Sequence, residues 1–187
     1  GFLRGEITAV RESTFRSRGK NGDIFWAMFN EPSDVVLRPL TAADQGIVWE
    51  MLMYAAHETQ DVRHRDNLKA YGEQFGREGD LGLVAVKYGQ VAGAAWVRSM
   101  SMRDSLRQTS HDDGIPELVI AVLPKFQGQG IGTVMLTSLL DESRKSGRAG
   151  VCLSCRADNA AIRLYLKLGF VKIPGSEINN RVGVISV

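Results

Sequence analysis

Short apolar runs and helically spaced sets of apolar residues alternate along this sequence from residue 34 onward. A compact apolar run predicts a strand, whereas apolar residues recurring every three or four positions predict a helix with one buried face. We therefore expect strands at 35–40, 81–86, 91–98, 118–123, 151–155, 170–173 and 182–187, and helices at 41–55, 67–77, 131–145 and 159–168. This order of elements predicts a mixed α/β sheet rather than a doubly wound one.

Local signals mark the ends of several of these elements. Thr41, with Asp44 three residues later, is a helix-start signature in which Asp takes the place of the usual Glu or Gln. Gly147 follows the helix expected at 131–145 and predicts its C-terminal end. The segment 87–90 (KYGQ) separates two strands and predicts a hairpin.

Two segments lack such periodicity. Residues 1–33 scatter basic residues among aromatics and glycines, and we interpret them as an N-terminal extension of unknown role, which places the folded domain at 34–187. Residues 99–116 are polar and predict a long loop. Loops of this length more often have a function than serve only as connections. Asp112 and Asp113 in this loop would attract a cationic amine if they lined a site, although a charged loop is usually only solvated.

The composition and charge of the chain limit the kinds of binding partner to expect. The chain has 187 residues, 44% of them apolar and 24% charged, as expected for one globular domain. Its formal net charge of +2 gives no electrostatic reason to expect a nucleic-acid partner. There is no apolar stretch of the roughly 18 residues that span a bilayer, and no apolar signal-peptide core is visible. We therefore expect a cytoplasmic protein with no membrane partner.

The two cysteines do not predict a metal site or a disulfide. Cys152 and Cys155 lie three residues apart in an expected strand, so their side chains would point to opposite faces. No histidine lies near them in the sequence, which also makes them poor candidates for a covalent nucleophile.

The stretch 117–133 (ELVIAVLPKFQGQGIGT) carries the strongest functional signal. A buried strand ends at Pro124, and Gly128, Gly130 and Gly132 then precede an amphipathic helix. Backbone N–H groups in such a turn, together with a helix N-terminus, form a site for phosphate. A P-loop would need a Gly-Lys-Ser/Thr sequence that is missing here, and a dinucleotide fold would need its third glycine one residue later and near the first strand.

The same turn fits another pattern, in which Gln127 stands three residues before Gly130 and five before Gly132. This arrangement after a buried strand resembles the acyl-CoA-binding signature of the GNAT superfamily of N-acyltransferases, Arg/Gln-x-x-Gly-x-Gly/Ala. The resemblance covers about 150 of the 187 residues. It implies the GNAT fold, which is a central mixed, mostly antiparallel sheet flanked by helices.

A second hallmark of that family also has a counterpart. Asn159 precedes an expected helix that carries Tyr165 and ends in Gly169-Phe170, which resembles the family's Asn, Tyr and Gly-Phe pattern. Asn159 lies six residues before Tyr165 where seven is common, so Asp158 is an alternative for the Asn position. The two hallmarks have the order and spacing of the family.

The resemblance implies a set of cofactor-binding residues. The strand segment before the turn would pair its backbone with the pantetheine amides and donate an N–H to the thioester oxygen, stabilising the oxyanion of the tetrahedral intermediate. The glycine turn would wrap the pyrophosphate of acetyl-CoA, with Gln127 bracing it, and Asn159 would contact pantetheine. The full set is Ile120, Ala121, Val122, Gln127, Gly128, Gln129, Gly130, Ile131, Gly132, Thr133 and Asn159.

Two residues are the candidate catalytic groups. Tyr165 matches the family tyrosine that can protonate the departing CoA thiolate, or it is simply a packing tyrosine. Glu117 is in register with the glutamate of histone-type members and is our candidate general base, acting through water; the alternative is a solvated residue at the start of the strand. Peptide N-terminal acetyltransferases of the family carry a glutamate on the next strand, where this chain has Leu153 and Ser154. The histidines, at 57, 64 and 111, could also serve, although an ordinary surface role is the safer interpretation.

From these features we predict an enzyme that transfers an acetyl group from acetyl-CoA to a primary amine by direct attack in a ternary complex. A small-molecule acceptor is favoured over a protein. The alternatives are a non-catalytic acyl-CoA-binding module and an acetyltransferase for a protein lysine or N-terminus. GNAT proteins are often dimers, so the resemblance leaves a homodimer open.

Overall fold

The computed structural model describes residues 35–101, 114–177 and 180–186. The expected N-terminal extension, most of the expected loop at 99–116 with His111, Asp112 and Asp113, and Val187 therefore lie outside the described residues.

Seven strands form one sheet in the order β1-β2-β3-β4-β5-β7-β6. Every neighbouring pair is antiparallel except β4 and β5, which are parallel. The strands are β1 (Val35–Pro39), β2 (Leu81–Lys87), β3 (Gln90–Arg98), β4 (Glu117–Val122), β5 (Val151–Arg156), β6 (Val171–Lys172) and β7 (Arg181–Ser186). The predicted mixed, mostly antiparallel sheet is confirmed.

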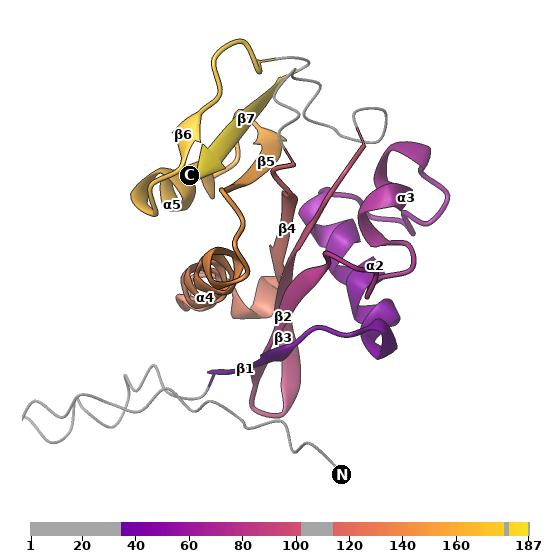
Figure 1. Ribbon diagram of the computed structural model, residues 1–187. Helices are drawn as coiled ribbons and strands as arrows, with labels where there is room; N and C mark the ends of the chain where they lie inside the picture. Colours follow the sequence, from indigo (N-terminus) through magenta and orange to yellow (C-terminus); the bar gives the residue numbers. More distant parts are fainter. Residues whose placement is uncertain (1–34, 102–113, 178–179, 187) are drawn as a thin grey trace, which may run out of the picture.

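Helices cover both faces of the sheet, with α2 and α3 on one face and α4 and α5 on the other (Figure 1). The α-helices are α2 (Gln45–Ala55), α3 (Asp66–Gly72), α4 (Ile131–Lys145) and α5 (Ile162–Lys167), and the 3₁₀ turns are η1 (Ala42–Asp44) and η2 (Pro124–Phe126). The order of strands and α-helices is the one predicted from the sequence. Among the described residues, no helix has both the length and the apolar character needed to cross a membrane.

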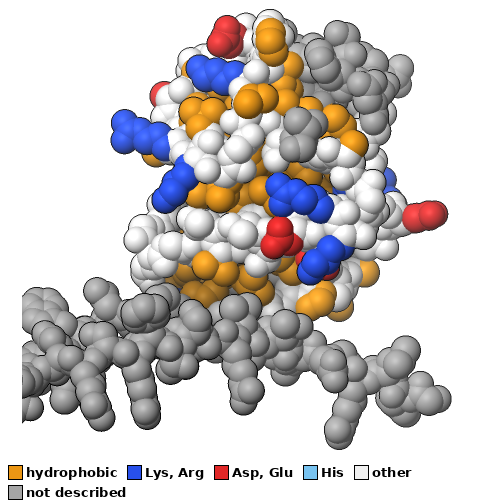
Figure 2. Space-filling model, turned by 60° about the vertical axis from the view of Figure 1, so that its left-hand side comes forward, with side chains coloured by type: hydrophobic (Ala, Val, Ile, Leu, Met, Phe, Trp, Pro, Cys, Tyr) orange, Lys and Arg blue, Asp and Glu red, His pale blue; other side chains and the backbone are white. Residues whose placement is uncertain are grey.

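The two faces of the sheet have separate apolar cores, because side chains of a strand alternate between its faces. On β4, Leu118 is buried in the core beneath α4 and α5, whereas Val119 and Ala121 are buried in the core beneath α2 and α3. Figure 2 shows the side of the molecule that carries α4 and α5, where Lys and Arg side chains are spread out between exposed apolar ones instead of forming one patch.

The predicted start of the first helix is confirmed. The Thr41 backbone N–H and its Oγ1 hydroxyl both donate to Asp44 Oδ2, at 2.9 and 3.0 Å. Arg38 adds a bidentate pair to the same carboxylate at 2.8 and 2.9 Å, and hydrogen bonding to Arg38 is the main reason why the pKa of Asp44 is lowered to about 2. The chain turns from β1 into η1 and α2 at this cluster.

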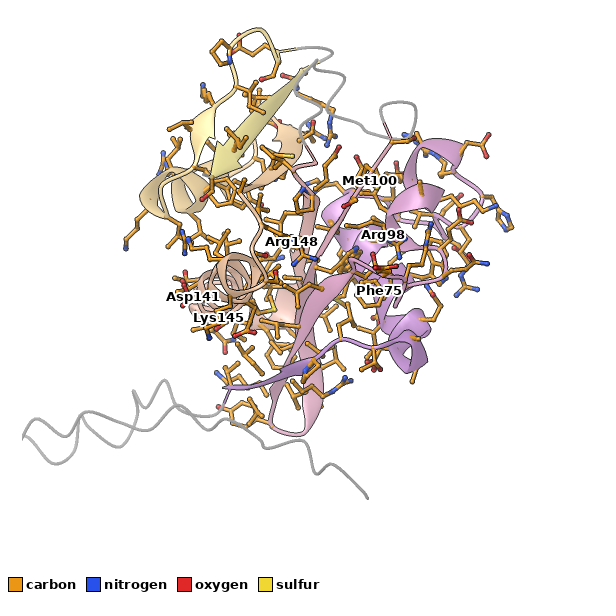
Figure 3. The ribbon with its side chains drawn as sticks, in the orientation of Figure 1. Phe75, Arg98, Met100, Asp141, Lys145 and Arg148 are labelled. Atoms are coloured by element: carbon orange, nitrogen blue, oxygen red, sulfur yellow. The ribbon has the colours of Figure 1, made fainter. Side chains whose placement is uncertain are left out.

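Helix α3 ends at Gly72, five residues earlier than predicted, where a buried arginine bonds to a backbone carbonyl of its last turn and to that of the C-cap residue. Arg98 donates to the carbonyl oxygens of Ala70 and Glu73 at 2.9 Å, and its guanidinium lies 5.7 Å from the centroid of the Phe75 ring (Figure 3). It also forms a two-bonded ion pair with Asp80, at 2.6 and 2.8 Å. The prediction of a helix to residue 77 was wrong at this end.

The predicted hairpin is confirmed, whereas the start of one more helix differs from the prediction. The hairpin between β2 and β3 turns on Tyr88 and Gly89, both with positive φ (51° and 71°), as a tight two-residue turn requires. Cys152 and Cys155 are both buried free thiols. Helix α5 begins three residues later than predicted, because the Asn159 side chain first accepts the Ala161 N–H at 2.9 Å and forms a turn.

Candidate active site

A groove separates β4 from β5. The two parallel strands pair at one position only, Glu117 opposite Cys152, next to a hydrogen bond from the Cys152 N–H to the Pro116 carbonyl (3.0 Å). Beyond this point the strands diverge, and a cavity of about 960 Å³ lies between them. Residues of β4, β5, α5 and the α2–α3 region line it, so the edge of β4 that faces β5 is open to a ligand.

The groove is reached by side chains from both faces of the sheet. On the α4/α5 face, Ile120 and Val122 pack against the core that contains Cys155 and Tyr165. The side chains at the intervening positions of these strands point to the α2/α3 face instead. They include Glu117 of β4, Ser154 and Arg156 of β5, and Arg181 of β7, and all four line the groove. Two different molecules could therefore approach the same strand gap from opposite sides.

The glycine turn follows β4 at one end of the groove. Gly128 and Gly130 have φ values of 74° and 78°, and a Cβ at either position would meet no protein atom within 4 Å. The requirement for glycine there thus comes from the backbone conformation, and the space above both positions is open. Gly130 is the N-cap of α4, and the first helical hydrogen bond runs from the Val134 N–H to the Gly130 carbonyl (3.1 Å). The N–H groups of residues 131–133 precede it and are available to an anion.

The remaining expected cofactor residues fall into two groups. Ile120, Ala121, Val122, Gln127, Gly132 and Asn159 line the groove. Gln127 Nε2 donates to the Val122 carbonyl at 3.0 Å and so ties the turn to the strand, as expected of a bracing residue. Gln129 does not line the groove, because its side chain bonds to Lys87 Nζ (2.7 Å) and the Lys125 carbonyl (3.2 Å).

Asn159 leaves part of its side chain available. Its Oδ1 is used by the Ala161 N–H, whereas its Nδ2 makes no hydrogen bond within the part of the chain described. The alternative residue, Asp158, is exposed and pairs with Arg156 at 2.9 Å. Asn159 is therefore the better placed of the two to donate to a ligand in the groove.

Glu117 is buried at the point where β4 and β5 meet, with only 2% of its surface exposed. The Tyr71 hydroxyl of α3 donates to Glu117 Oε2 at 2.6 Å, and Trp96 Nε1 holds the Tyr71 carbonyl at 2.9 Å. The alternative of a solvated strand-start residue is thus wrong. A buried, oriented carboxylate on the wall of a groove can accept a proton, directly or through water.

Tyr165 lies on α5 with its ring 5.7 Å from the Phe170 ring, and it lines the groove. Burial, and then the nearby Cys155, raise the pKa of its hydroxyl. Within the described residues no hydrogen bond holds this hydroxyl. It is therefore protonated at neutral pH and able to donate.

The two histidines within the described residues contribute little to this arrangement. His57 lines the groove at the end of α2, whereas His64 is exposed and does not line it. In the described ranges no three His, Cys, Asp or Glu side chains gather in a way that could hold a metal ion.

Sequence reasoning missed Tyr71 and Arg181. Tyr71 has only the helical spacing of a core residue, and its partner Glu117 is 46 residues away. Arg181 begins β7, where its Nε donates to Ser154 Oγ (3.0 Å) and its Nη2 to the Ser154 carbonyl (2.7 Å). No local signal in the sequence predicts either contact.

Comparison with known proteins gives concordant matches. The sequence model described as "Acetyltransferase (GNAT) family" matches residues 46–170. The L-methionine sulfoximine/L-methionine sulfone acetyltransferase of Salmonella typhimurium is 34% identical over 142 residues, which are 73% of this chain and 80% of that protein. The [ribosomal protein bS18]-alanine N-acetyltransferase of Escherichia coli K12 is 52% identical over 52 residues, and this match spans only 35% of that protein and 27% of this chain.

Solved structures agree in fold. The putative acetyltransferase yncA from Salmonella typhimurium, determined with its cofactor acetyl-CoA, has a TM-score of 0.59 and 23% identity, covering 82% of this chain and 93% of its own. A ribosomal-protein-alanine N-acetyltransferase from Brucella melitensis has a TM-score of 0.59 and 23% identity, covering 81% of this chain and 99% of its own.

Proposed function

Because this chain belongs to the acetyltransferase (GNAT) family, we propose that it transfers an acetyl group from acetyl-CoA to a primary amine. The observation that carries the proposal is the gap between β4 and β5, which has a glycine turn at one end and a buried carboxylate at the other. The reaction is direct attack of the amine on the thioester in a ternary complex. We place the activity in residues 34–187 and expect a cytoplasmic protein.

Acetyl-CoA is assigned to the α4/α5 side of the groove. The N–H groups of residues 131–133 face the pyrophosphate, and the open edge of β4 at residues 120–122 pairs with pantetheine. A backbone N–H of this edge then lies near the thioester oxygen and stabilises the oxyanion that forms on attack. Asn159 Nδ2 donates to a pantetheine carbonyl.

The amine is assigned to the α2/α3 side, where Glu117 acts as general base. An alkylammonium must lose a proton before it can attack, and a positioned carboxylate contributes about 10²- to 10⁴-fold to such a step. The acceptor is a small molecule. Both kinds of acceptor occur among similar proteins, since one is named for methionine sulfoximine and another for an alanine of a ribosomal protein.

A Glu117→Gln variant is expected to lower kcat by about 100-fold at neutral pH, because the amide retains an acceptor for the Tyr71 hydroxyl but cannot take a proton. The loss should shrink at high pH, where the amine deprotonates unaided. Steady-state rates across a pH series measure this, with Tyr71→Phe as the control that removes the hydrogen bond but keeps the carboxylate. A kcat within twofold of wild type would exclude Glu117 as the base.

Tyr165→Phe is expected to reduce kcat by on the order of 10- to 100-fold without abolishing turnover. The free thiol of CoA has a pKa near 8.5, so the thiolate needs only modest help to leave. The phenylalanine ring retains the packing against Phe170, and the affinity for acetyl-CoA should stay unchanged. Single-turnover measurement of thiol release gives the rate, and an undiminished rate would mean that Tyr165 only packs.

The function itself is tested by incubating the protein with acetyl-CoA and a broad panel of primary amines while free thiol is followed. We expect amine-dependent thiol release together with the acetylated amine by mass spectrometry. Binding of CoA in the absence of release with every amine would favour the non-catalytic acyl-CoA-binding module instead.

A further inference from the structure

Three arginines line the groove, and two of them are neutralised. Arg65 pairs with Glu58 at 3.1 Å, and Arg156 pairs with Asp158 at 2.9 Å. Arg181 lines the same groove, and no carboxylate of the described residues pairs with it. Among the described residues, Glu58, Asp158 and Glu117 are the carboxylates that line the groove, and Arg181 is the one arginine there that is bonded to none of them.

Arg181 is held in place by the sheet. Two of its five N–H donors bond to Ser154, one to the hydroxyl and one to the carbonyl oxygen, which fixes the guanidinium and leaves other donors for a ligand. Its charge acts on the Cys155 thiol in the groove wall, where it partly offsets the burial that raises the pKa of that thiol. A fixed, partly buried guanidinium is suited to bind a carboxylate through two parallel hydrogen bonds, that is, in a bidentate way.

The position of Arg181 in the sheet is electrostatically unfavourable. Arg156 and Arg181 are directly opposite each other on β5 and β7, and like charges in such a pair are destabilising. Asp158 supplies one counter-charge for the two guanidinium groups. An anionic ligand on Arg181 would remove the remaining imbalance.

The position of Arg181 points to the amine acceptor rather than to CoA. The guanidinium is anchored to Ser154, on the α2/α3 side of the groove, whereas the glycine turn that would hold the phosphates leads into α4 on the other face. Ser154 lies two residues beyond Cys152, the partner of Glu117 in the β4/β5 pair. The rise of a strand places Ser154 on the order of 7 Å along β5 from Cys152, in the direction in which β4 and β5 diverge. An amine and a carboxylate on one carbon atom, each with a hydrogen bond of about 3 Å, span such a distance.

We propose that the acceptor is a free α-amino acid, whose carboxylate binds Arg181 and whose amine faces Glu117. This inference rests on the proposed acetyl transfer and specifies its substrate class. It excludes lysine side chains, polyamines and peptide N-termini as preferred acceptors, because none of these carries a carboxylate next to the reacting amine.

The test compares each acceptor with its carboxamide. Wild-type protein is assayed for thiol release with the standard L-amino acids, L-methionine sulfone, the primary carboxamide of each, spermidine, and a peptide that begins with alanine. We expect kcat/KM for the best amino acid to exceed that of its carboxamide by at least about 10-fold. The amine of a carboxamide loses its proton more easily, so intrinsic reactivity would favour the opposite order.

Substitutions of Arg181 test whether this residue causes the preference for the acid over the carboxamide. In Arg181→Gln the ratio of acid to carboxamide should fall to about one, through a higher KM for the acid, and Arg181→Lys should restore part of it. Arg144→Gln is the control, because it removes an exposed arginine that pairs with Asp141 on α4 and does not line the groove, and it should retain the preference. All variants should bind CoA as wild type does, which verifies that they are folded.

The outcomes separate the inference from the function on which it rests. Thiol release with carboxamides, spermidine or the peptide at rates equal to or above those with amino acids would overturn the inference and leave the acetyltransferase intact. An unchanged ratio in Arg181→Gln, or its loss in Arg144→Gln, would overturn the role of Arg181. Absence of thiol release with every amine would remove the proposed function and this inference with it.

Discussion

Replacing Gly130 with glutamate should weaken CoA binding by at least about 100-fold, which corresponds to about 2.7 kcal/mol of binding free energy. Gly130 caps α4 with a φ of 78°, and the space above it is free of protein atoms, so a side chain there would project into the position assigned to the pyrophosphate. A carboxylate at that point would also interact with the same N–H groups that the phosphates need. Titration calorimetry with CoA measures the affinity.

The opposite end of the same helix supplies the control. Gly147 follows α4, also has a φ of 78°, and a Cβ there would likewise meet nothing within 4 Å. Gly147→Glu therefore imposes the same backbone strain without reaching the phosphate site, and CoA affinity should stay close to that of wild type. Equal loss in both variants would mean that backbone strain, not the site, is responsible, and unchanged affinity in Gly130→Glu would refute the site.

Replacing Arg98 with methionine should lower the free energy of unfolding by about 3–5 kcal/mol, because it leaves Asp80 buried without its counter-charge. Both side chains of this ion pair are almost fully buried, at 4% and 3% exposure. The variant also removes donors from the carbonyls of Ala70 and Glu73, where α3 ends. Denaturant unfolding followed by circular dichroism measures the change.

Two further variants separate the effect of the unpaired buried charge of Asp80 from the other effects of the substitution. The double variant Asp80→Asn/Arg98→Met should be more stable than Arg98→Met alone, since no uncompensated carboxylate remains. Arg156→Met removes an exposed ion pair and should change stability little. If Arg98→Met were as stable as wild type, the pair would contribute nothing to the fold.

The same pair has a pH signature. Burial by itself raises the pKa of the Asp80 carboxyl, but the hydrogen bonds from Arg98 and from the Gly76 and Arg77 N–H groups outweigh it and hold this pKa below its ordinary value. A carboxyl with a lowered folded-state pKa contributes its full stabilisation above the unfolded pKa of about 3.9 and loses it as the pH falls through the folded value. Acid should therefore narrow the stability difference between wild type and Arg98→Met.

Much of the fold could be predicted because it is encoded locally. The order of the strands and α-helices, the hairpin at Tyr88-Gly89 and the start of the first helix at Thr41 depend on residues only a few positions apart. The end of α3 could not be predicted, because the carbonyls near Gly72 are bonded by Arg98, whose side chain comes from a strand that follows much later. Tertiary contacts decided that boundary, not helix propensity.

The residues of the candidate site likewise divide into those that could be predicted from the sequence and those that depend on tertiary contacts. The glycine turn is a contiguous motif, so its residues could be named from the sequence, although Gln129 faces away from the groove. Glu117 could be proposed only by resemblance, and its bond to Tyr71 depends on how α3 packs on the sheet. Arg181 meets Ser154 through the register of β7 on β5, which no local pattern reveals. Its part in the site remains a prediction.

The alternation of β4 has a consequence for how such an enzyme can change. Under the proposed function, the odd-numbered residues from Glu117 to Ala121 face the acceptor side, and the even-numbered residues from Leu118 to Val122 face the cofactor side. Substitutions at odd positions can therefore alter which amine is accepted without disturbing acetyl-CoA, and substitutions at even positions can do the reverse. Insertion of a single residue within this strand would instead exchange the two surfaces and disable both at once.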